Sequence, residues 1–163
     1  MKLSDLKETS ENINLDDYLY LYRYVRENME HPEWLGTFER EEIEELLKSE
    51  GKIWLYYDGD IPVCSVFYLP ASNKSLRKHH VEYDASITGS LGPIMVRKEY
   101  VGNGLQRQMQ DVINEYAKSI GKQHMFTKAH SDNHYSIDNI LKDGYKLVDT
   151  YQNERGPNSA FIR

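Results

Sequence analysis

The sequence predicts an α+β fold: a mixed, mostly antiparallel twisted sheet of about six to seven strands flanked by four helices. Two observations predict it. Several segments carry hydrophobic residues at helical spacing, and short runs rich in Val, Ile, Tyr and Phe lie between them, as is typical of strands. Strand hairpins are expected early and late in the chain, with strand–helix–strand crossovers between them, and this order favours a mixed sheet.

Two helices are expected before the first hairpin. The segment 15–29 is predicted as a helix capped by Asn14, with acidic residues in its first turn, where the helix dipole favours them. The segment 37–50 is predicted as a second helix, capped by Thr37 and closed by Gly51. A short strand is allowed before the first of these helices.

The hydrophobic period then changes from helical to strand-like. Residues 52–58 and 61–69 are predicted as two strands joined by an Asp-Gly-Asp turn. The polar, basic segment 70–84 is expected to be a loop or a strand extension. The remaining elements are expected in this order: a strand within 85–97, a helix over 104–120, a strand over 122–130, a helix over 133–143, and final strands over 145–152 and 159–163.

Length and composition are those of a globular protein. The 163 residues favour one domain spanning 1–163, with 39% hydrophobic and 28% charged residues. No apolar run approaches the ~20 residues of a membrane span, and the N-terminus lacks the layout of a signal peptide, so a cytoplasmic location is expected. The net charge of −6 disfavours nucleic acid or membrane partners and suits a cationic substrate such as an amine.

Cysteine and metal chemistry are not expected to carry the function. Cys64 is the one cysteine and lies in an apolar strand, where a structural thiol is typical. His79 and His80 are adjacent, so on a strand they would point to opposite faces, whereas His130 and His134 straddle a strand end and a helix start. No Cys or carboxylate set completes a site, so no metal is expected.

Tyrosine is abundant, with 13 copies in the chain. Tyr18, Tyr20, Tyr22 and Tyr24 are spaced two apart along the first predicted helix, so they cannot all face one side. A helix with aromatic residues on both core and rim is favoured over an aromatic wall for a substrate.

The segment 94–109 carries the most informative pattern. A strand is expected to end at Val96, a loop holds Gly102 and Gly104, and an amphipathic helix starts at once. Glycine lets the backbone come close to a ligand, and the first N–H groups of a helix form an anion site with the helix dipole. A diphosphate is the expected occupant, and a tight turn with a glycine cap is the alternative. Neither the Walker nor the dinucleotide glycine pattern is present.

A second pattern follows in the segment 129–148. Asn133 and Ser136 start a helix that is expected to end at Gly144 and Tyr145. By itself, Asn133 could be only a helix cap. The whole order of strand, Gly-x-Gly, helix, strand, Asn-x-x-Ser helix, Gly-aromatic and strand is more specific than either part.

On these residues the chain resembles the GNAT (GCN5-related N-acetyltransferase) superfamily. The loop pattern of that family, Gln/Arg-x-x-Gly-x-Gly/Ala, is matched by residues 99–104, with Glu99 in its first position. The later pattern of the family, Asn-x-x-Ala/Ser ending in Gly-Phe/Tyr, is matched with the expected spacing by Asn133, Ser136, Gly144 and Tyr145. The resemblance covers residues 91–148, and the rest of the chain fits the element order of the family.

The resemblance implies a GNAT-like fold that uses acetyl-CoA as co-substrate and acetylates a primary amine of a small molecule or peptide. The strand end would hold the pantetheine arm, the glycine loop the diphosphate, and the later helix the far side of the CoA arm. The amine would attack the thioester directly, with a backbone N–H near Val96 polarising the carbonyl. The residues implied in cofactor binding are Ile94, Met95, Val96, Val101, Gly102, Asn103, Gly104, Leu105, Gln106, Asn133 and Ser136.

Three positions depart from the family pattern. Glu99 stands where a Gln or basic residue would contact a phosphate, Gly92 where many members carry an acidic base, and Ile140 where a tyrosine often protonates the leaving thiolate. The catalytic residues therefore stay open. A water molecule, Glu82 or Asp84 could remove the proton from the amine, although both carboxylates are more typical of exposed charges.

Two other functions stay open at this stage. A non-catalytic acyl-CoA-binding or regulatory module would keep the cofactor cradle and lose the acid–base residues. A purely structural α+β domain would leave the second pattern unexplained. The acceptor, the length of the acyl group and the oligomeric state, monomer or homodimer, are not predicted.

Overall fold

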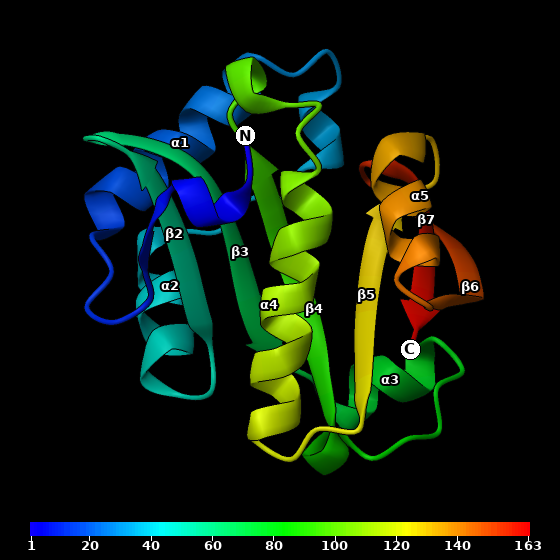
Figure 1. Ribbon diagram of the computed structural model, residues 1–163. Coiled ribbons are helices and arrows are strands. Elements are labelled where there is room, and N and C mark those ends of the chain that lie inside the picture. The colour runs from blue at the N-terminus through cyan, green and yellow to red at the C-terminus, as the bar shows by residue number, and fades with distance from the viewer.

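The computed structural model describes residues 1–163 and contains one seven-stranded sheet (Figure 1). The strands are β1 (Lys7–Thr9), β2 (Lys52–Asp58), β3 (Ile61–Pro70), β4 (Thr88–Val96), β5 (His124–His130), β6 (Lys146–Asn153) and β7 (Gly156–Ile162). Their order across the sheet is β1-β2-β3-β4-β5-β7-β6, and only the β4–β5 pair is parallel. The prediction of a mixed, mostly antiparallel sheet is therefore confirmed.

The one parallel pair is short. Thr88–Ser90 of β4 pairs with His124–Phe126 of β5, and no further residues of these two strands pair with each other. The last contact is a side-chain hydrogen bond of 3.0 Å, which the Thr127 hydroxyl donates to the Leu91 carbonyl. Beyond it the two strands diverge, and Figure 1 shows them separating toward their carboxyl ends. The sheet is therefore open at its centre, and the ends of both strands are left with a free edge.

Five α-helices flank the sheet: α1 (Leu15–Glu27), α2 (Arg40–Lys48), α3 (Asn73–Lys78), α4 (Leu105–Ser119) and α5 (His134–Lys142). Four short 3-10 turns join them: η1 (Leu3–Asp5), η2 (Pro32–Trp34), η3 (Ala85–Ile87) and η4 (Lys98–Tyr100). Helix α4 crosses one face of the sheet, and α1 and α2 lie behind the opposite face (Figure 1). The helices therefore form an outer layer on each side of the sheet.

Strand β2 shows how one segment supplies two cores. Trp54 and Tyr56 belong to the core under α4, whereas Ile53 and Leu55 belong to the core under α1 and α2. Successive side chains of a strand point to opposite faces, so a strand that is covered on both faces is apolar throughout. The bounds predicted for this strand are the observed ones, and Gly59, with φ of 60°, makes the turn into β3.

Helix α4 is fixed on the sheet by residues spaced four apart. Leu105, Met109, Ile113 and Ala117 are each at most 2% exposed, as expected for one stripe of a helix that faces a core. Because the stripe begins at the first helical residue, the N-terminus of α4 is held against the end of β4.

The tyrosines of α1 divide between core and rim, as the sequence favoured. Tyr18 and Tyr22 are buried in the core. Tyr20 and Tyr24 lie on another face and surround Arg97, whose guanidinium carbon is 3.9 Å from the ring centroid of Tyr24. None of the four lines the larger cavity described below, so they do not form a substrate wall.

The segment 70–84, predicted as a loop or strand extension, contains the helix α3. This expectation was wrong because Leu76 is the only buried residue of the short, polar helix, and one buried residue gives no hydrophobic period. His79 and His80 consequently end a helix and do not lie on a strand. Both rings approach the Asp149 carboxylate, at 2.8 Å and 3.7 Å respectively. The sheet is thus flanked by five helices and not by four.

Two predicted boundaries also need correction. Helix α2 is capped by Glu39 and not by Thr37, and the Glu39 backbone N–H donates to the Glu42 side chain at 3.0 Å in a capping box. The last strand begins at Gly156, three residues before the predicted start. Gly and Pro are depleted in strands, but Gly156 and Pro157 are the first two residues of β7, directly after the β6–β7 turn, where both are tolerated.

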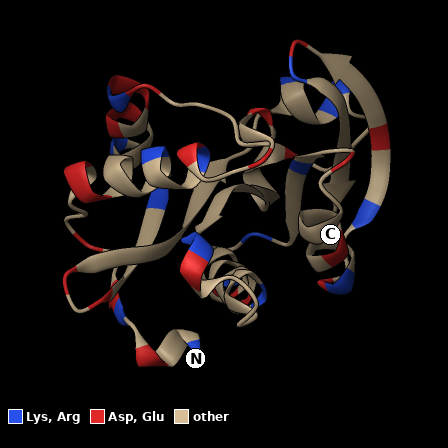
Figure 2. Cartoon of the chain, turned by 90° about the horizontal axis from the view of Figure 1, so that it is seen from above, with Lys and Arg blue, Asp and Glu red and all other residues tan.

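Charged residues of both signs are interspersed over the outer elements. Figure 2 shows acidic and basic residues side by side on the helices and turns, whereas the central strands are largely uncharged. No helix is both long and apolar enough to cross a bilayer.

Candidate functional site

The loop between β4 and α4 has an unusual backbone. Gly102 has φ of 97°, and Gly104, which is the N-cap of α4, has φ of 71° and ψ of 20°. Side chains disfavour this left-handed region, so glycine is required here by conformation. A Cβ at Gly102 would meet no atom within 4 Å, and one at Gly104 would meet none closer than 3.7 Å. Space therefore stays free beside both glycines.

A run of backbone N–H groups in this loop has no partner in the protein. From Gly102 to Arg107, none of the six N–H groups donates to a backbone or side-chain acceptor, and the first helical bond runs from the Gln108 N–H to the Gly104 carbonyl. Unpaired N–H groups at a helix N-terminus, together with the helix dipole, attract anions. A row of unpaired N–H groups is therefore available at the position where the sequence predicts an anion site.

The side chains of the loop brace it from outside. The Asn103 amide donates to the Tyr100 carbonyl at 2.9 Å, so this side chain is engaged within the loop. The Glu99 carboxylate accepts a hydrogen bond from the Tyr24 hydroxyl, which lowers the pKa of Glu99. Glu99 is therefore bound to α1, and its carboxylate is occupied there instead of contacting an anion at the N–H groups of α4.

The larger of the two main cavities, with a volume of about 800 Å³, begins beside this loop. Val101 and Gln106 line its end at α4, together with Asn133 and Ser136 of α5. The cavity passes the diverging ends of β4 and β5 and reaches the loop between α1 and α2, where Trp34 lines it. One continuous cavity thus connects the two faces of the sheet through its open centre.

The end of β4 forms one wall of the passage. Ile94, Met95 and Val96 all line the cavity, and β4 is paired here only with β3. Alternate N–H and C=O groups of a strand point to opposite sides, so those not bound to β3 face the open centre. They can hydrogen-bond an extended ligand as a neighbouring strand would.

A chain of hydrogen bonds links the N-termini of α4 and α5 across the cavity. The Gln106 amide donates to the Ser136 hydroxyl at 3.3 Å, and the Ser136 backbone N–H donates to the Asn133 side chain at 3.3 Å. Asn133 is therefore the cap of α5, which is the structural role that the sequence allowed, and it also lines the cavity. The two sequence patterns meet at this point. Of the predicted cofactor residues, Leu105 and Met95 belong to the hydrophobic cores, and each is 1% exposed. Met95 also lines the cavity, whereas Leu105 does not.

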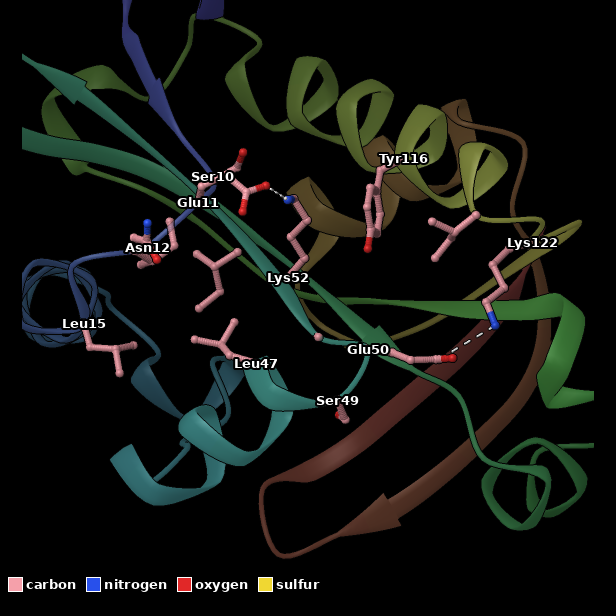
Figure 3. A pocket seen from close by; sticks show the side chains of 14 residues that line it. Ser10, Glu11, Asn12, Leu15, Leu47, Ser49, Glu50, Lys52, Tyr116 and Lys122 are labelled. Atoms are coloured by element: carbon pink, nitrogen blue, oxygen red, sulfur yellow. Dashed lines mark hydrogen bonds and ion pairs between the residues drawn. The ribbon is translucent and has the colours of Figure 1, made fainter.

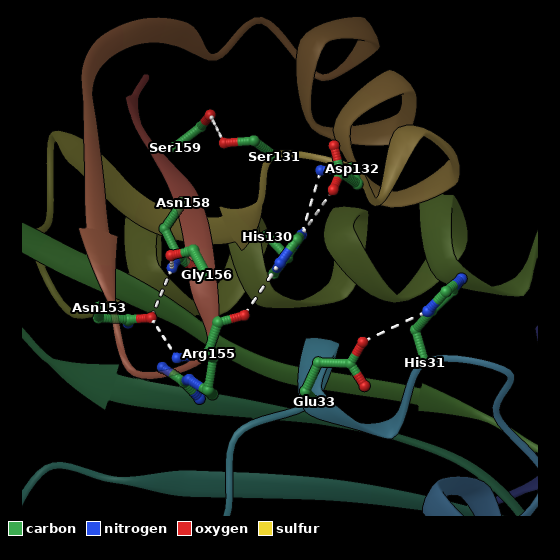
Figure 4. A network of polar contacts seen from close by, with 10 residues as sticks. All are labelled: His31, Glu33, His130, Ser131, Asp132, Asn153, Arg155, Gly156, Asn158 and Ser159. Carbon is green, nitrogen blue, oxygen red and sulfur yellow. Dashed lines mark hydrogen bonds and ion pairs between the residues drawn. The ribbon is translucent and has the colours of Figure 1, made fainter.

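At the far end, a row of aromatic rings bridges two segments. His31 stacks on Trp34 at 4.4 Å between ring centroids, and Trp34 stacks on His130 at 5.6 Å. His31 Nδ1 lies 3.3 Å from a carboxylate oxygen of Glu33. Figure 4 shows His31 and Glu33 on one side of His130, and Arg155 on the other.

Both ring nitrogens of His130 are engaged. Its Nδ1 accepts the backbone N–H of Asp132 at 3.2 Å, so Nε2 carries the proton and donates to the Arg155 carbonyl at 3.1 Å (Figure 4). With no free lone pair, His130 is a structural residue that ties β5 to the β6–β7 turn. Only His31, of the two histidines in the cavity, has a nitrogen available for proton transfer.

No protein-family model and no curated protein matches the sequence. Solved structures match nearly the whole chain. An N-acetyltransferase from Staphylococcus aureus Mu50 has a TM-score of 0.72 at 14% identity, covering 96% of this chain and 98% of that chain. A putative acetyltransferase from Salmonella typhimurium, solved with its cofactor acetyl-CoA, has a TM-score of 0.68 at 14% identity, with coverage of 96% and 92%. The GNAT domain of PAT from S. lividans has a TM-score of 0.70 at 11% identity, with coverage of 97% and 89%. This chain has the GNAT fold.

Within this GNAT fold, Gly92 is required by packing. A Cβ at Gly92 would lie 2.7 Å from the Phe67 carbonyl oxygen and 2.9 Å from the Leu69 side chain, and the β3–β4 register shifts at this point. An acidic side chain therefore has no room at Gly92. Ile140, the other departure, is 2% exposed and presents only an apolar surface to the cavity.

The two carboxylates that the sequence suggested as bases are far from the passage. Glu82 and Asp84 precede β4 and lie before its start at Thr88, at the opposite end of that strand from Val96. Neither lines the cavity. Asp84 instead accepts the Ser86 backbone N–H at 2.8 Å and caps the turn η3, which lowers its pKa. Both are exposed charges, as the alternative interpretation held.

A second cavity of the GNAT fold, of about 660 Å³, lies beside the C-terminal part of α4 (Figure 3). None of the predicted site residues lines it. Its cations are paired, because Lys52 Nζ lies 2.9 Å from Glu11 and Lys122 Nζ lies 3.8 Å from Glu50.

Sequence reasoning missed the far end of the larger cavity altogether. Its polar residues come from the loop between α1 and α2, from β5 and from the β6–β7 turn. These segments carry no motif, and only the structure brings His31, Lys128 and Arg155 to one cavity. His130 was noticed in the sequence, but only as a metal candidate.

Proposed function

We propose that this chain is an acetyl-CoA-dependent N-acetyltransferase that acts on a primary amine. One observation carries the proposal: six backbone N–H groups, from Gly102 to Arg107, lack partners at one end of a cavity of about 800 Å³. A diphosphate satisfies such a row of donors. The likeness to an acetyltransferase solved with acetyl-CoA supports a CoA thioester as the ligand.

The proposed binding mode divides the cofactor among three parts of the fold. The N–H groups of the glycine loop hold the diphosphate, and the free edge of β4 hydrogen-bonds the pantetheine arm. Asn133 and Ser136 lie on the other side of that arm. The proposed cofactor-binding residues remain Ile94, Met95, Val96, Val101, Gly102, Asn103, Gly104, Leu105, Gln106, Asn133 and Ser136, with Leu105 acting through its backbone only. The Val101 N–H donates to the Lys98 carbonyl at 3.3 Å, so Val101 contributes its side chain to the cavity and no N–H to the diphosphate.

The proposed reaction is a direct transfer. The neutral amine attacks the thioester carbonyl carbon, a C–N bond forms, and the C–S bond breaks to release CoA thiolate, which takes up a proton from solvent. A backbone N–H at the end of β4 near Val96 stabilises the developing oxyanion. The open centre of the sheet supports this geometry, because an acyl group on the α4 side can meet an amine that enters from the α1–α2 side.

The amine must lose a proton, and Gly92 supplies no carboxylate for it. We propose His31 as the acceptor, directly or through water. A proton on its Nδ1 would be donated to Glu33, at 3.3 Å, which leaves the lone pair of Nε2 free for the amine. His31 and Glu33 both line the cavity.

Two measurements test the proposal in order. Titration calorimetry with CoA and acetyl-CoA should detect binding, and the absence of heat with both would refute the cofactor site. Release of free thiol from acetyl-CoA should then depend on an added amine, across polyamines, aminoglycosides, amino acids and peptide N-termini. CoA binding without amine-dependent thiol release would favour the non-catalytic module, which the apolar Ile140 and Gly92 also fit.

A further inference from the structure

Two cations in the larger cavity have no counter-ion. Lys128 lies on β5, and Arg155 lies in the turn between β6 and β7; both line the cavity. Neither forms an ion pair, and neither side chain forms a hydrogen bond with the protein. Both residues are exposed to the solvent that fills the cavity. Partial desolvation and the nearby charges of Arg155 and Lys78 lower the pKa of Lys128. Like charges therefore face each other here without compensation.

The backbone that carries Arg155 is held firmly, although its side chain is free. The Arg155 carbonyl accepts from His130 at 3.1 Å, and its N–H donates to the Asn153 side chain at 2.9 Å (Figure 4). The Asn158 amide braces the same turn through Asn153 and Gly156, each at 2.9 Å. This network fixes the backbone position from which the Arg155 side chain extends into the cavity.

The guanidinium of Arg155 lies directly beside Gly36. A Cβ at Gly36 would lie 2.5 Å from Nη1 of Arg155. The guanidinium therefore packs directly on the loop between α1 and α2, at the far end of the cavity.

The nearby acidic residues do not neutralise these cations. Glu33 and Glu30 both lie within 4 Å of His31, at 3.3 Å and 3.8 Å. Glu154 is adjacent to Arg155 in sequence but forms no ion pair with it. In the second cavity, by contrast, each lysine has a carboxylate partner (Figure 3). Lys128 and Arg155 therefore differ from the two lysines of the second cavity in having no carboxylate partner.

We propose that Arg155 and Lys128 form an anion subsite that binds the acidic group of the acceptor, so that the acceptor is an amine with a carboxylate or a phosphate at its other end. This inference rests on the proposed function, because it names the class of acceptor for the same cavity. The guanidinium offers a planar pair of donors for a carboxylate or phosphate, and the lysine adds a point charge.

The cavity has a complementary charge for the other end of such an acceptor. The carboxylates of Glu30 and Glu33 attract an ammonium group on the side of His31, which is the proposed proton acceptor. Arg155 lies on the opposite side of His130 (Figure 4). An amine that carries an anion can therefore span the cavity with each end near the opposite charge.

Matched acceptors test the proposal. Each L-amino acid is compared with its amide, and phosphoethanolamine with ethanolamine, both for thiol release from acetyl-CoA and for binding to the CoA-loaded protein. We expect at least about a tenfold preference in kcat/KM and in Kd for the anionic member of a pair, since hydrogen bonds to charged groups are worth about this much or more. The amino-acid and phosphoethanolamine arms separate a carboxylate from a phosphate.

Variants locate the effect. Arg155→Gln and Lys128→Gln should each lower binding of the preferred amine with an anionic group about tenfold to a hundredfold and leave the partner that lacks this group within about twofold. Arg155→Lys should restore part of the loss. Arg23→Gln and Lys146→Gln are matched controls, because these exposed cations lie outside the cavity, and they should change neither value.

The two proposals fail in different ways. If CoA does not bind, the proposed function fails, and amine binding is then measured on the ligand-free protein. If CoA binds but anionic amines have no advantage in release or in binding, the anion subsite alone is wrong. An Arg155→Gln effect of equal size on amines with and without the anionic group would also overturn it.

Discussion

The two ends of the larger cavity are built from different parts of the chain. The end at α4 consists of main-chain N–H groups and the edge of a strand, whereas the far end consists of side chains from three separate segments. Main-chain groups keep their positions when side chains change, so the first end tolerates a departure such as Glu99. Single substitutions can alter the far end. In the proposed binding mode, main-chain groups therefore hold the cofactor and a few side chains select the acceptor.

The largest effect is expected from Gly104→Asp. The new side chain would strain a backbone with φ of 71° and place a negative charge beside the N–H groups, so CoA affinity should fall at least about a hundredfold. Gly59→Asp is the control, since it introduces the same residue at φ of 60° in a hairpin where nothing lies within 4 Å. Titration calorimetry measures both. Unchanged CoA affinity in Gly104→Asp would refute the assignment of the site.

A smaller effect is expected where side chains assist the main chain. Gln106→Met removes the hydrogen bond to Ser136 at nearly constant volume, so CoA should bind about tenfold more weakly. Gln110→Met is the matched control: Gln110 is fully buried on the same helix, donates to Asn139 and does not line the cavity. Equal losses of CoA affinity in the two variants would mean that the link across the cavity plays no part in binding.

Gly36→Ala addresses the far end without removing a charge. The added methyl group would displace the flexible guanidinium of Arg155 and leave the backbone in place. We expect KM for the preferred anionic amine to rise about threefold to tenfold, with CoA affinity unchanged. In the background of Arg155→Gln the same substitution should have no further effect on KM. Additive effects would show that Gly36 acts by another route.

The smallest effect is expected from ionisation of the Cys64 thiol, which lies in the core away from both ends of the cavity. Burial raises the pKa of its thiol to about 12 from the ordinary 9.0. The folded state therefore holds this proton more tightly, and the thiol's contribution to stability is present below pH 9 and is lost as the pH rises toward 12. At pH 8 the folded protein should not react with a disulfide reagent, whereas the unfolded protein should release one equivalent. Rapid reaction of the folded protein would contradict this assignment.

Much of the fold could be predicted because its strongest patterns are local. The stripe of α4 and the alternation of β2 are set by burial of nearby residues, and Asn14 and Asn133 cap helices as expected. Helix α3 could not be predicted, because it depends on the contact of Leu76 with Phe126 and Ala160, which are distant in sequence. Local propensity carries no information about such contacts.

The same distinction applies to the site. The glycine loop and the Asn-x-x-Ser helix start are short segments with their own backbone geometry, so their residues could be predicted and the structure brings them together. The far end depends on Trp34, Lys128 and Arg155 meeting across the β6–β7 turn and the α1–α2 loop. No residue spacing in the sequence predicts that these three residues line one cavity, because the arrangement of the strands around the open centre of the sheet brings them together.

The short β4–β5 pair has a consequence for how the molecule responds to a ligand. Three residue pairs join four strands on one side to three on the other. Amide protons of the paired residues of β4 and β5 should exchange slowly with deuterated water in the free protein. Amide protons at the unpaired carboxyl ends of these strands should exchange quickly. A ligand that lies between the two strand ends would act as an eighth strand and slow amide exchange in both β4 and β5.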